Sequence, residues 1–327
     1  MSGGRSRGFV GVINERLINT IYNTEWLKEL TKTGLLACTS RYPIGRNIYD
    51  RDWDLLIVLD ACRVDALRQV APDYEFLEEI ESVWSVGSAT AEWTANTFVQ
   101  SYRETIRETA CVTANGTVKW TMEGDNRQLE NDLVAAWLTD FDMVSPEDFL
   151  LLDTVWEYGP RDPYGGLIVP EAVTDRVVRV GRKKNWNRLI AHYMPPHAPH
   201  RSRAITANRH LKFHEANPWK AIRNGTDRSR VWDNYLADLR WVLDTVEELL
   251  RNVDAEKVVI TADHGDAFGE YGVYSHPMGV PHPHIRRVPW AQTTAVDSGE
   301  YVPRLVDQDT ESLDRAVDDQ LRKLGYL

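Results

Sequence analysis

The chain has 327 residues, of which 43% are hydrophobic and 27% charged, a composition that supports a buried core and argues against intrinsic disorder. The formal net charge of −11 disfavours a nucleic-acid partner. The three cysteines show no Cys-x-x-Cys spacing, which argues against a disulfide framework and against a thiolate zinc site: Cys38, Cys62 and Cys111.

Residues 9–30 place apolar side chains three and four positions apart, which predicts an amphipathic helix. We expect this helix to pack on the body of the protein. The alternative is a peripheral membrane contact through residues 9–30, because three arginines lie close to the apolar face: Arg5, Arg7 and Arg16. No apolar run is long enough to span a bilayer and residues 1–17 lack a secretory pattern, so we expect a cytoplasmic protein.

The rest of the chain alternates strand patterns with helix patterns. An apolar run at 53–59 predicts a strand buried on both faces. The other predicted strands are 110–116, 186–193 and 257–262, and the predicted helices are 62–70, 91–102, 230–251 and 311–324. This order predicts an α/β fold, three-layered and doubly wound, with a mostly parallel sheet and helices on both faces.

Polar clusters follow three of these predicted strands. Asp60 ends the first strand, where it would also serve as a helix N-cap. The stretch 192–200 supplies three histidines in a loop stiffened by prolines, and Asp263-His264 follows the strand at 257–262. A carboxylate beside an imidazole at a tight turn suits a divalent metal. Because ligands bind beyond the carboxyl ends of parallel strands, we expect these clusters to meet at one edge of the sheet.

Four segments, in this order, resemble motifs of sulfatases and their relatives in the alkaline phosphatase superfamily. They are LLIVLDACRVDAL (55–67), SVGSATAEWTANTF (85–98), HYMPPHAPH (192–200) and VVITADHGDAFGEYGVYSHP (258–277). The resemblance extends from about residue 50 to residue 290 and is nearest to short archaeal proteins labelled sulfatase-like. It implies an N-terminal helix and lead-in over residues 1–50, followed by a single sulfatase-like catalytic domain over residues 51–327.

The resemblance also implies roles for individual residues. Asp60, Asp263 and His264 would ligate one divalent metal ion, with Thr90 as the fourth ligand and as the nucleophile. Such a mixed oxygen and nitrogen ligand set favours Mn or Zn over Ca. The alternative for Thr90 is that it only caps the helix predicted at 91–102.

Three further residues would contact the substrate. His197 would bind its anionic oxygens or protonate the leaving group, and His276 would lie on the other side of the transferred group. Arg63 would reach the anion from the turn after the first strand, or else form a surface ion pair.

The nucleophile segment departs from the arylsulfatase pattern. Sulfatases that depend on formylglycine carry Cys-x-Pro-Ser-Arg or Ser-x-Pro-x-Arg, whereas this chain reads Thr-Ala-Glu-Trp over residues 90–93, and formylglycine cannot form from threonine. We therefore expect a metal-dependent hydrolase or transferase of a phosphate or sulfate ester. The alternatives are a sulfatase that works without formylglycine, and a catalytically degenerate sulfatase-like binding module. The expected substrate is a small anionic ester of a sugar, a lipid head group or a nucleotide.

Overall fold

The computed structural model describes residues 25–124 and 140–305. The helix predicted over residues 311–324 lies outside the described residues. Residues 9–24 of the helix predicted over residues 9–30 also lie outside them. The described part of the chain begins with α2 (Glu25–Arg41). None of the described helices combines the length and the apolar character needed to cross a bilayer.

A sheet of seven strands forms the centre of the protein, in the order β2-β9-β6-β1-β5-β3-β4. Five neighbouring strands are parallel: β6 (Ala255–Thr261), β1 (Leu55–Leu59), β5 (Arg188–Tyr193), β3 (Thr109–Thr113) and β4 (Leu151–Thr154). β9 (Arg287–Ala295) pairs antiparallel with β6 and with the edge strand β2 (Ile80–Trp84). The prediction of a mostly parallel sheet is confirmed.

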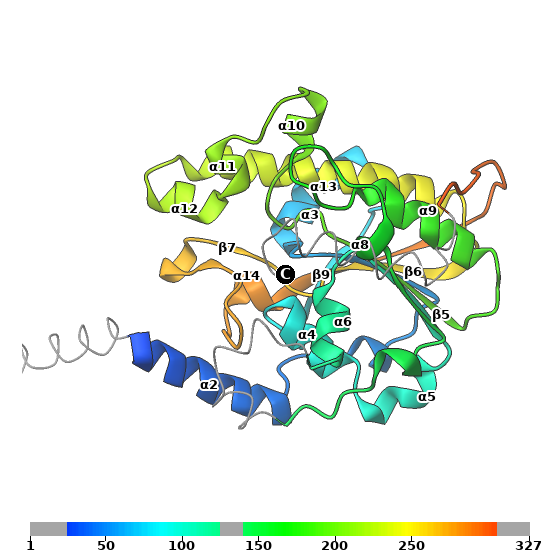
Figure 1. Cartoon of the computed structure of the whole chain (residues 1–327), viewed down its shortest axis with the longest axis horizontal. Coiled ribbons are helices and arrows are strands. Elements are labelled where there is room, and N and C mark those ends of the chain that lie inside the picture. The colour runs from blue at the N-terminus through cyan, green and yellow to red at the C-terminus, as the bar shows by residue number, and fades with distance from the viewer. Residues whose placement is uncertain (1–24, 125–139, 306–327) are drawn as a thin grey trace, which may run out of the picture.

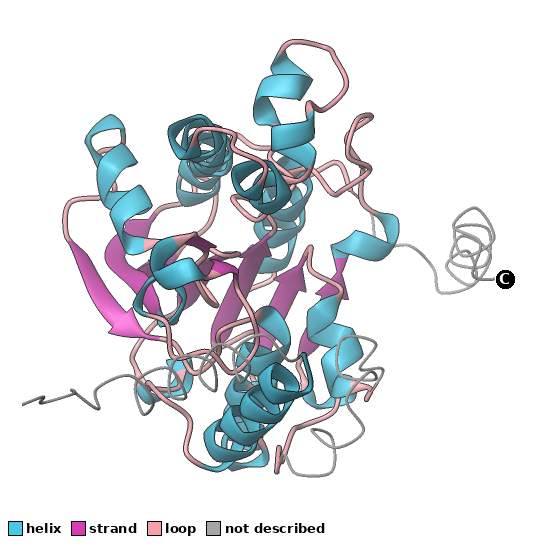
Figure 2. Cartoon of the chain, turned by 90° about the vertical axis from the view of Figure 1, so that its left-hand side faces the viewer, coloured by secondary structure: helices cyan, strands magenta, loops and turns pink. Residues whose placement is uncertain are grey.

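Helices cover both faces of this sheet, and Figure 2 shows the strands between two helical layers. Leu55, Ile57 and Leu59 of β1 pack on the face covered by α3 (Val64–Val70), α9 (Pro170–Gly181) and α13 (Arg228–Leu250). Leu56 and Val58 pack on the other face, against α4 (Thr90–Thr97), α5 (Arg103–Ile106) and α6 (Thr117–Met122). Burial of each such side chain contributes about 1.5–3 kcal/mol, which fixes the strand in the middle of the sheet.

The helix predicted over residues 91–102 is shorter in the structure. It consists of α4, which ends at Thr97, and a separate 3-10 turn over Gln100–Tyr102. The strands β2, β4 and β9 and the helix α9 were not predicted from the sequence. β2 lies at the sheet edge with partly exposed side chains, so it lacks the apolar run that marks the central strands.

The remaining short elements surround the carboxyl edge of the sheet. They are α8 (Val155–Tyr158), α10 (Ser202–Thr206), α11 (Phe213–Ala216), α12 (Pro218–Arg223), the hairpin of β7 (Ala267–Phe268) and β8 (Tyr274–Ser275), and α14 (Pro283–Arg286). Figure 1 shows α11 and α12 on the same side of the molecule as β7. Because β1, β5 and β6 are neighbours, the segments that follow them leave the sheet next to one another.

Candidate active site

Four residues predicted as metal ligands lie together at the carboxyl edge of the sheet. Asp60 follows β1, Asp263 and His264 follow β6, and Thr90 is the first residue of α4. The Thr90 hydroxyl donates to Asp263 Oδ2 at 2.8 Å and lies 3.4 Å from His264 Nε2. His264 Nε2 lies 3.6 Å from Asp60 Oδ1 and 3.4 Å from Asp263 Oδ2. All four side chains are buried.

Thr90 does not cap α4. Ala89 is the N-cap residue, with extended backbone angles, and Thr90 occupies the first helical position. Its hydroxyl points at Asp263 and also lies 3.5 Å from Asp60 Oδ2. The interpretation of Thr90 as only a helix cap is therefore wrong, because its oxygen contacts two carboxylates instead of the backbone of its own helix.

Two residues that were not predicted as ligands belong to the same cluster. Asn115 follows β3, and its Nδ2 donates to Asp60 Oδ2 at 2.6 Å and to Thr90 Oγ1 at 3.2 Å. His192, the penultimate residue of β5, places Nε2 3.9 Å from Asp60 Oδ2. The rule that led to Asp60 would also have found Asn115, since both are polar residues just after a parallel strand. His192 differs from His197 and His200 in lying within the strand predicted at 186–193, but the sequence did not indicate that this strand lies beside the strand that ends at Asp60.

The cluster fits a divalent cation. Asp60, His192 and Asp263 offer ligand atoms that lie within 4.8 Å of one another. Within the described residues, Asp60 Oδ1 and His192 Nε2 have no hydrogen-bond partner although both are buried. Buried polar atoms without partners are costly, and an ion that accepts their lone pairs removes that cost. The residue types present, carboxylate oxygen and imidazole nitrogen, suit Mn or Zn.

Electrostatics in the cluster favour the same conclusion. Burial, and then the charge of Asp263, raise the pKa of Asp60 well above its usual value. Burial lowers the pKa of His192 to about 4, so its imidazole is neutral near pH 7 and available as a ligand. Burial and the Asp263 charge thus disfavour the ionised form of Asp60. A divalent cation would offset both effects and stabilise the two carboxylates.

His197 and His276 line a pocket of about 390 Å³ together with Thr90. The imidazole centroids of His197 and His276 are 5.0 Å apart, and those of His264 and His276 are 4.3 Å apart. The other residues that line the pocket are Ala89, Asn115, Thr117, Met194, Ser275, Pro277 and Met278. Among the described residues, this lining contains neither lysine nor arginine. The side chains of this lining that can carry a positive charge are therefore the histidines, and a bound cation would add to them.

The pKa values of the two pocket histidines are shifted in opposite directions. Burial alone would lower the pKa of His276, but the Asp266 carboxylate, 2.7 Å from its Nδ1, raises it above the usual value. Burial, and then the neighbouring His276, lower the pKa of His197 to about 4. His197 Nδ1 lies 2.6 Å from the carbonyl oxygen of Ala198, so the neutral ring carries its proton there and presents Nε2 as an acceptor.

Unlike the other predicted site residues, Arg63 neither belongs to the cluster around Thr90 nor lines the pocket. Its Nε and Nη2 donate to Asp65, and its Nη1 donates to Glu270 and to the carbonyl oxygen of Asp266. The remaining Nη2 proton points to His284 Nδ1, at 3.0 Å. All five N–H groups are therefore engaged, and two of them bind the Asp65 carboxylate, whose side chain is 51% exposed, which agrees with the alternative of an ion pair at the surface. The expectation that Arg63 binds the substrate's anion is corrected, because no donor is left for it.

Glu92 joins two walls of the pocket. Its Oε2 accepts hydrogen bonds from Ser88 N and Oγ, and from Gly279 N in the segment after the pocket-lining Met278. Its Oε1 accepts from Arg286 Nη2 and from Thr39 Oγ1 of α2. One buried carboxylate thus ties the start of α4, which carries Thr90, to the segment that follows His276. The sequence analysis gave Glu92 no role.

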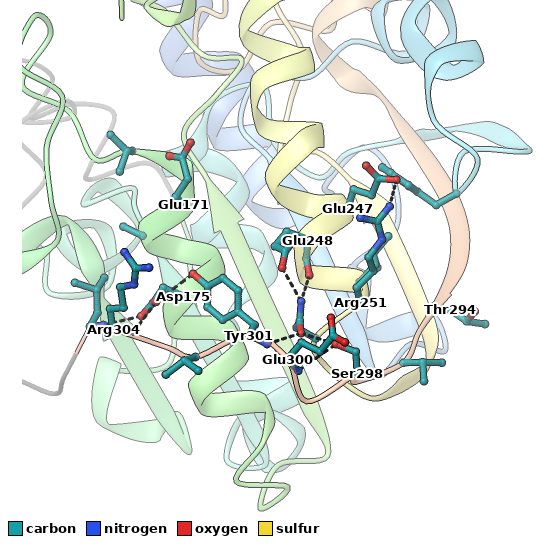
Figure 3. Close-up of a pocket in the computed structure, with 18 of the residues that line it drawn as sticks. Glu171, Asp175, Glu247, Glu248, Arg251, Thr294, Ser298, Glu300, Tyr301 and Arg304 are labelled. Atoms are coloured by element: carbon teal, nitrogen blue, oxygen red, sulfur yellow. Dashed lines mark hydrogen bonds and ion pairs between the residues drawn. The ribbon is translucent and has the colours of Figure 1, made fainter. Parts of the chain in front are cut away.

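A second cavity, of about 1280 Å³, lies elsewhere in the described structure (Figure 3). It is bounded by α9, the end of α13 and residues 294–305. Asp175 accepts hydrogen bonds from Tyr301 Oη and from the backbone N–H groups of Arg304 and Leu305, so this carboxylate anchors the last described segment. None of the predicted site residues lines this cavity.

No family model matches the chain, and no curated protein matches it. Among solved structures, the soluble domain of lipooligosaccharide phosphoethanolamine transferase A from Neisseria meningitidis is 13% identical with a TM-score of 0.48, covering 78% of this chain and 80% of that one. A 2-O GAG sulfatase is 13% identical with a TM-score of 0.44, covering 76% and 66%. The lipoteichoic acid synthase LtaP from Listeria monocytogenes is 12% identical with a TM-score of 0.38, covering 76% and 66%.

These three neighbours are a transferase, a sulfatase and a synthase. At 12–13% identity and TM-scores below 0.5, the likeness carries no conclusion about what this chain does. The functional interpretation therefore rests on the residues of the site.

Proposed function

We propose that this protein is a metal-dependent hydrolase or transferase that acts on a phosphate or sulfate ester, with Thr90 as the nucleophile. One observation carries the proposal. The Thr90 hydroxyl lies in a buried cluster of Asp60, Asp263 and His264, and the same residue lines a pocket with His197 and His276. A nucleophile, a charge-stabilising cluster and two proton-transfer groups are thereby within one site.

Asp60, Asp263, His264 and Thr90 would hold the metal ion, with His192 as a further candidate ligand. When bound, such an ion acts as a Lewis acid that favours the alkoxide form of a hydroxyl and neutralises developing negative charge. The hydrogen bond from Thr90 Oγ1 to Asp263 Oδ2 holds the hydroxyl proton away from the pocket. The oxygen lone pairs can then face an ester bound between the two histidines.

In the proposed reaction, Thr90 Oγ1 passes its proton to Asp263 Oδ2 and forms a bond to phosphorus or sulfur, and the bond to the leaving oxygen breaks. His276 is assigned as the acid that protonates this oxygen, because Asp266 raises the pKa of its imidazole. His197 is assigned as the base, because its neutral ring presents Nε2 as an acceptor. It would take a proton from the water or alcohol that releases the product from Thr90. Groups whose pKa values are pushed apart commonly divide acid and base roles in this way.

The charge of the pocket favours esters with a single negative charge. A phosphate monoester carries nearly two negative charges at neutral pH, and the pocket lining has no lysine or arginine to balance the second. A phosphodiester or a sulfate monoester carries one charge, which the metal and a protonated His276 can balance. We therefore rank these two ester classes above phosphate monoesters.

The test is turnover of three matched 4-nitrophenyl esters: a methyl phosphodiester, a sulfate and a phosphate monoester. The protein is loaded with Mn or with Zn, and kcat/KM is measured for each ester. We expect turnover of the diester or the sulfate, or both, to exceed that of the monoester. Preference for the sulfate alone would establish the sulfatase that works without formylglycine. No turnover of any ester by metal-loaded protein would favour the degenerate binding module.

A further inference from the structure

Residues 201–230, here called the basic lobe, have a charge opposite to that of the whole chain. The basic lobe comprises α10, α11, α12 and the first turn of α13. It contains eight lysines and arginines against two aspartates and glutamates, whereas the whole chain has a formal net charge of −11. Such an asymmetry produces a local positive potential in an otherwise acidic protein.

Three of these cations have acidic partners. Arg201 pairs with Asp162, Arg209 with Glu215 and Arg228 with Glu270. The other five are exposed and form no ion pair within the described residues: Arg203, Lys212, Lys220, Arg223 and Arg230. Burial lowers the pKa of His214, and the charges of Arg230, Lys212 and Arg209 lower it further, so cations of three segments converge around this imidazole.

The basic lobe lies directly beside the proposed active site. The chain leaves β5, passes the pocket residue His197 and enters the lobe at Arg201. On its other side, the lobe packs on the β7–β8 hairpin, where the Trp219 and Phe268 ring centroids are 4.8 Å apart. The Arg223 guanidinium lies 4.6 Å from the centroid of Tyr274, the residue just before the pocket-lining Ser275. Figure 1 shows α10, α11 and α12 above this hairpin.

We propose that the basic lobe binds further anionic groups of a polyanionic substrate while the pocket holds the single ester that reacts. This inference rests on the proposed function and names its substrate class: a soluble chain that carries repeated sulfate or phosphate groups. Among the described residues, the pocket lining offers no lysine or arginine for the additional charges, whereas the adjoining lobe contains five exposed cations without an ion pair, one of which, Arg223, contacts the hairpin beside the pocket.

A polymer fits this surface better than a membrane does. Protein surfaces that bind membranes combine cations with several apolar side chains that enter the bilayer. Phe213, which is 50% exposed, is the one large apolar side chain of the basic lobe with such exposure. The binding expected here is therefore electrostatic and sensitive to salt.

The test is binding of heparin and of inorganic polyphosphate to the full chain, measured by titration calorimetry across a range of salt concentrations. The lobe variant is Arg203→Gln/Lys212→Gln/Lys220→Gln. The matched control is Lys184→Gln/Arg251→Gln/Lys257→Gln, which removes the same charge from the opposite edge of the sheet, where these cations pair with Asp254, Glu247 and Asp52. Circular dichroism of both variants verifies folding.

We expect the lobe variant to bind at least one of the two polyanions about 10-fold or more weakly at about 0.1 M salt. Its slope of log affinity against log salt should fall by roughly one for each removed cation that contacts the ligand. The control should bind like the unaltered chain. Equal loss in both variants, or no loss in either, would overturn the proposal. Binding to phosphatidylglycerol vesicles without binding to either soluble polyanion would overturn it in favour of a membrane surface.

Turnover of the small nitrophenyl esters tests the proposed function separately. If the polyanion binds through the lobe but no ester is turned over, the proposed chemistry is refuted. The polyanion would then be a ligand and not a substrate, while the binding surface would stand. Ester turnover without lobe-dependent polyanion binding would refute the surface and leave the chemistry.

Discussion

Arg286 Nη2 donates to Glu92 Oε1 at 2.6 Å, in a position where neither side chain reaches solvent. The two residues are 194 positions apart in the chain. Glu92 lies two residues after the proposed nucleophile Thr90, and Arg286 ends α14, in the segment that follows His276. This buried ion pair therefore sets the distance between the two sides of the pocket.

Replacing Glu92 with Gln should lower both stability and turnover. The substitution leaves the buried Arg286 guanidinium without a counter-charge, which costs about 3–5 kcal/mol. We expect kcat to fall because the start of α4 and residues 277–280 lose their shared anchor. Urea unfolding and steady-state kinetics measure the two effects. Thr39→Val, which removes one hydrogen bond to Glu92 from α2, is the control and should cost about 1 kcal/mol with little change in kcat.

The same pair predicts how stability depends on pH. Burial raises the pKa of Glu92, but Arg286 and the hydrogen bonds from Ser88 more than offset this, and the net shift is downward from 4.5. A carboxyl whose pKa is depressed in the folded protein stabilises it above the unfolded pKa. The stability difference between the unaltered chain and Glu92→Gln should thus be constant above about pH 5.5 and shrink as pH falls below 4.5. A difference that grows on acidification would contradict this assignment.

Thr90→Ala should fold and lose turnover. The substitution removes the hydrogen bond to Asp263 and the one from Asn115, each worth about 1 kcal/mol, but it also removes the attacking oxygen. Loss of a nucleophile costs several orders of magnitude in rate, on the order of 10³-fold or more. Thr90→Ser keeps the hydroxyl and should retain much of the activity. If well-folded Thr90→Ala turned over esters at the unaltered rate, the attacking group would have to be a water molecule.

Removal of the metal should destabilise the protein. An ion present at 100–1,000 times its dissociation constant stabilises the folded state by about 3–4 kcal/mol. Thermal unfolding before and after dialysis against EDTA, with metal content measured in both samples, checks this expectation. Asp60→Asn/Asp263→Asn should abolish the response to EDTA, because it removes both carboxylates of the cluster. An unchanged Tm in protein shown to have lost its metal would argue against the metal site.

His276→Gln should discriminate between leaving groups. If His276 protonates the leaving oxygen, its loss costs roughly 10²–10⁴-fold for an alkyl ester, whose leaving group requires a proton. The loss should be much smaller for a 4-nitrophenyl ester, which leaves as a stable anion. Asp266→Asn should show the same pattern in weaker form, since Asp266 holds Nδ1 of His276. Equal losses for both esters would assign His276 to binding and not to proton transfer.

The sequence by itself determined four neighbouring strands of the sheet, β6, β1, β5 and β3, and the positions of Asp60 and Asp263 at the ends of two of them. The apolar runs at 53–59 and 257–262 are local signals, so β1 and β6 were predicted to within two residues. Parallel strands end at a common edge, which is why Asp60 and Asp263 could be expected to meet although 203 positions separate them. Thr90 was placed by its resemblance to a nucleophile motif, and the structure brings it to the same cluster.

Only the tertiary structure decided which neighbouring polar residues join the cluster and which do not. His192 and Asn115 reach Asp60 because β5 and β3 lie beside β1 in the sheet, an order that strand patterns do not encode. Arg63 adjoins Asp60 closely in the chain, yet Asp65 and Glu270 take up its donors. Sequence periodicity reports which side of an element is buried, whereas the partner of a buried polar group depends on packing between distant segments.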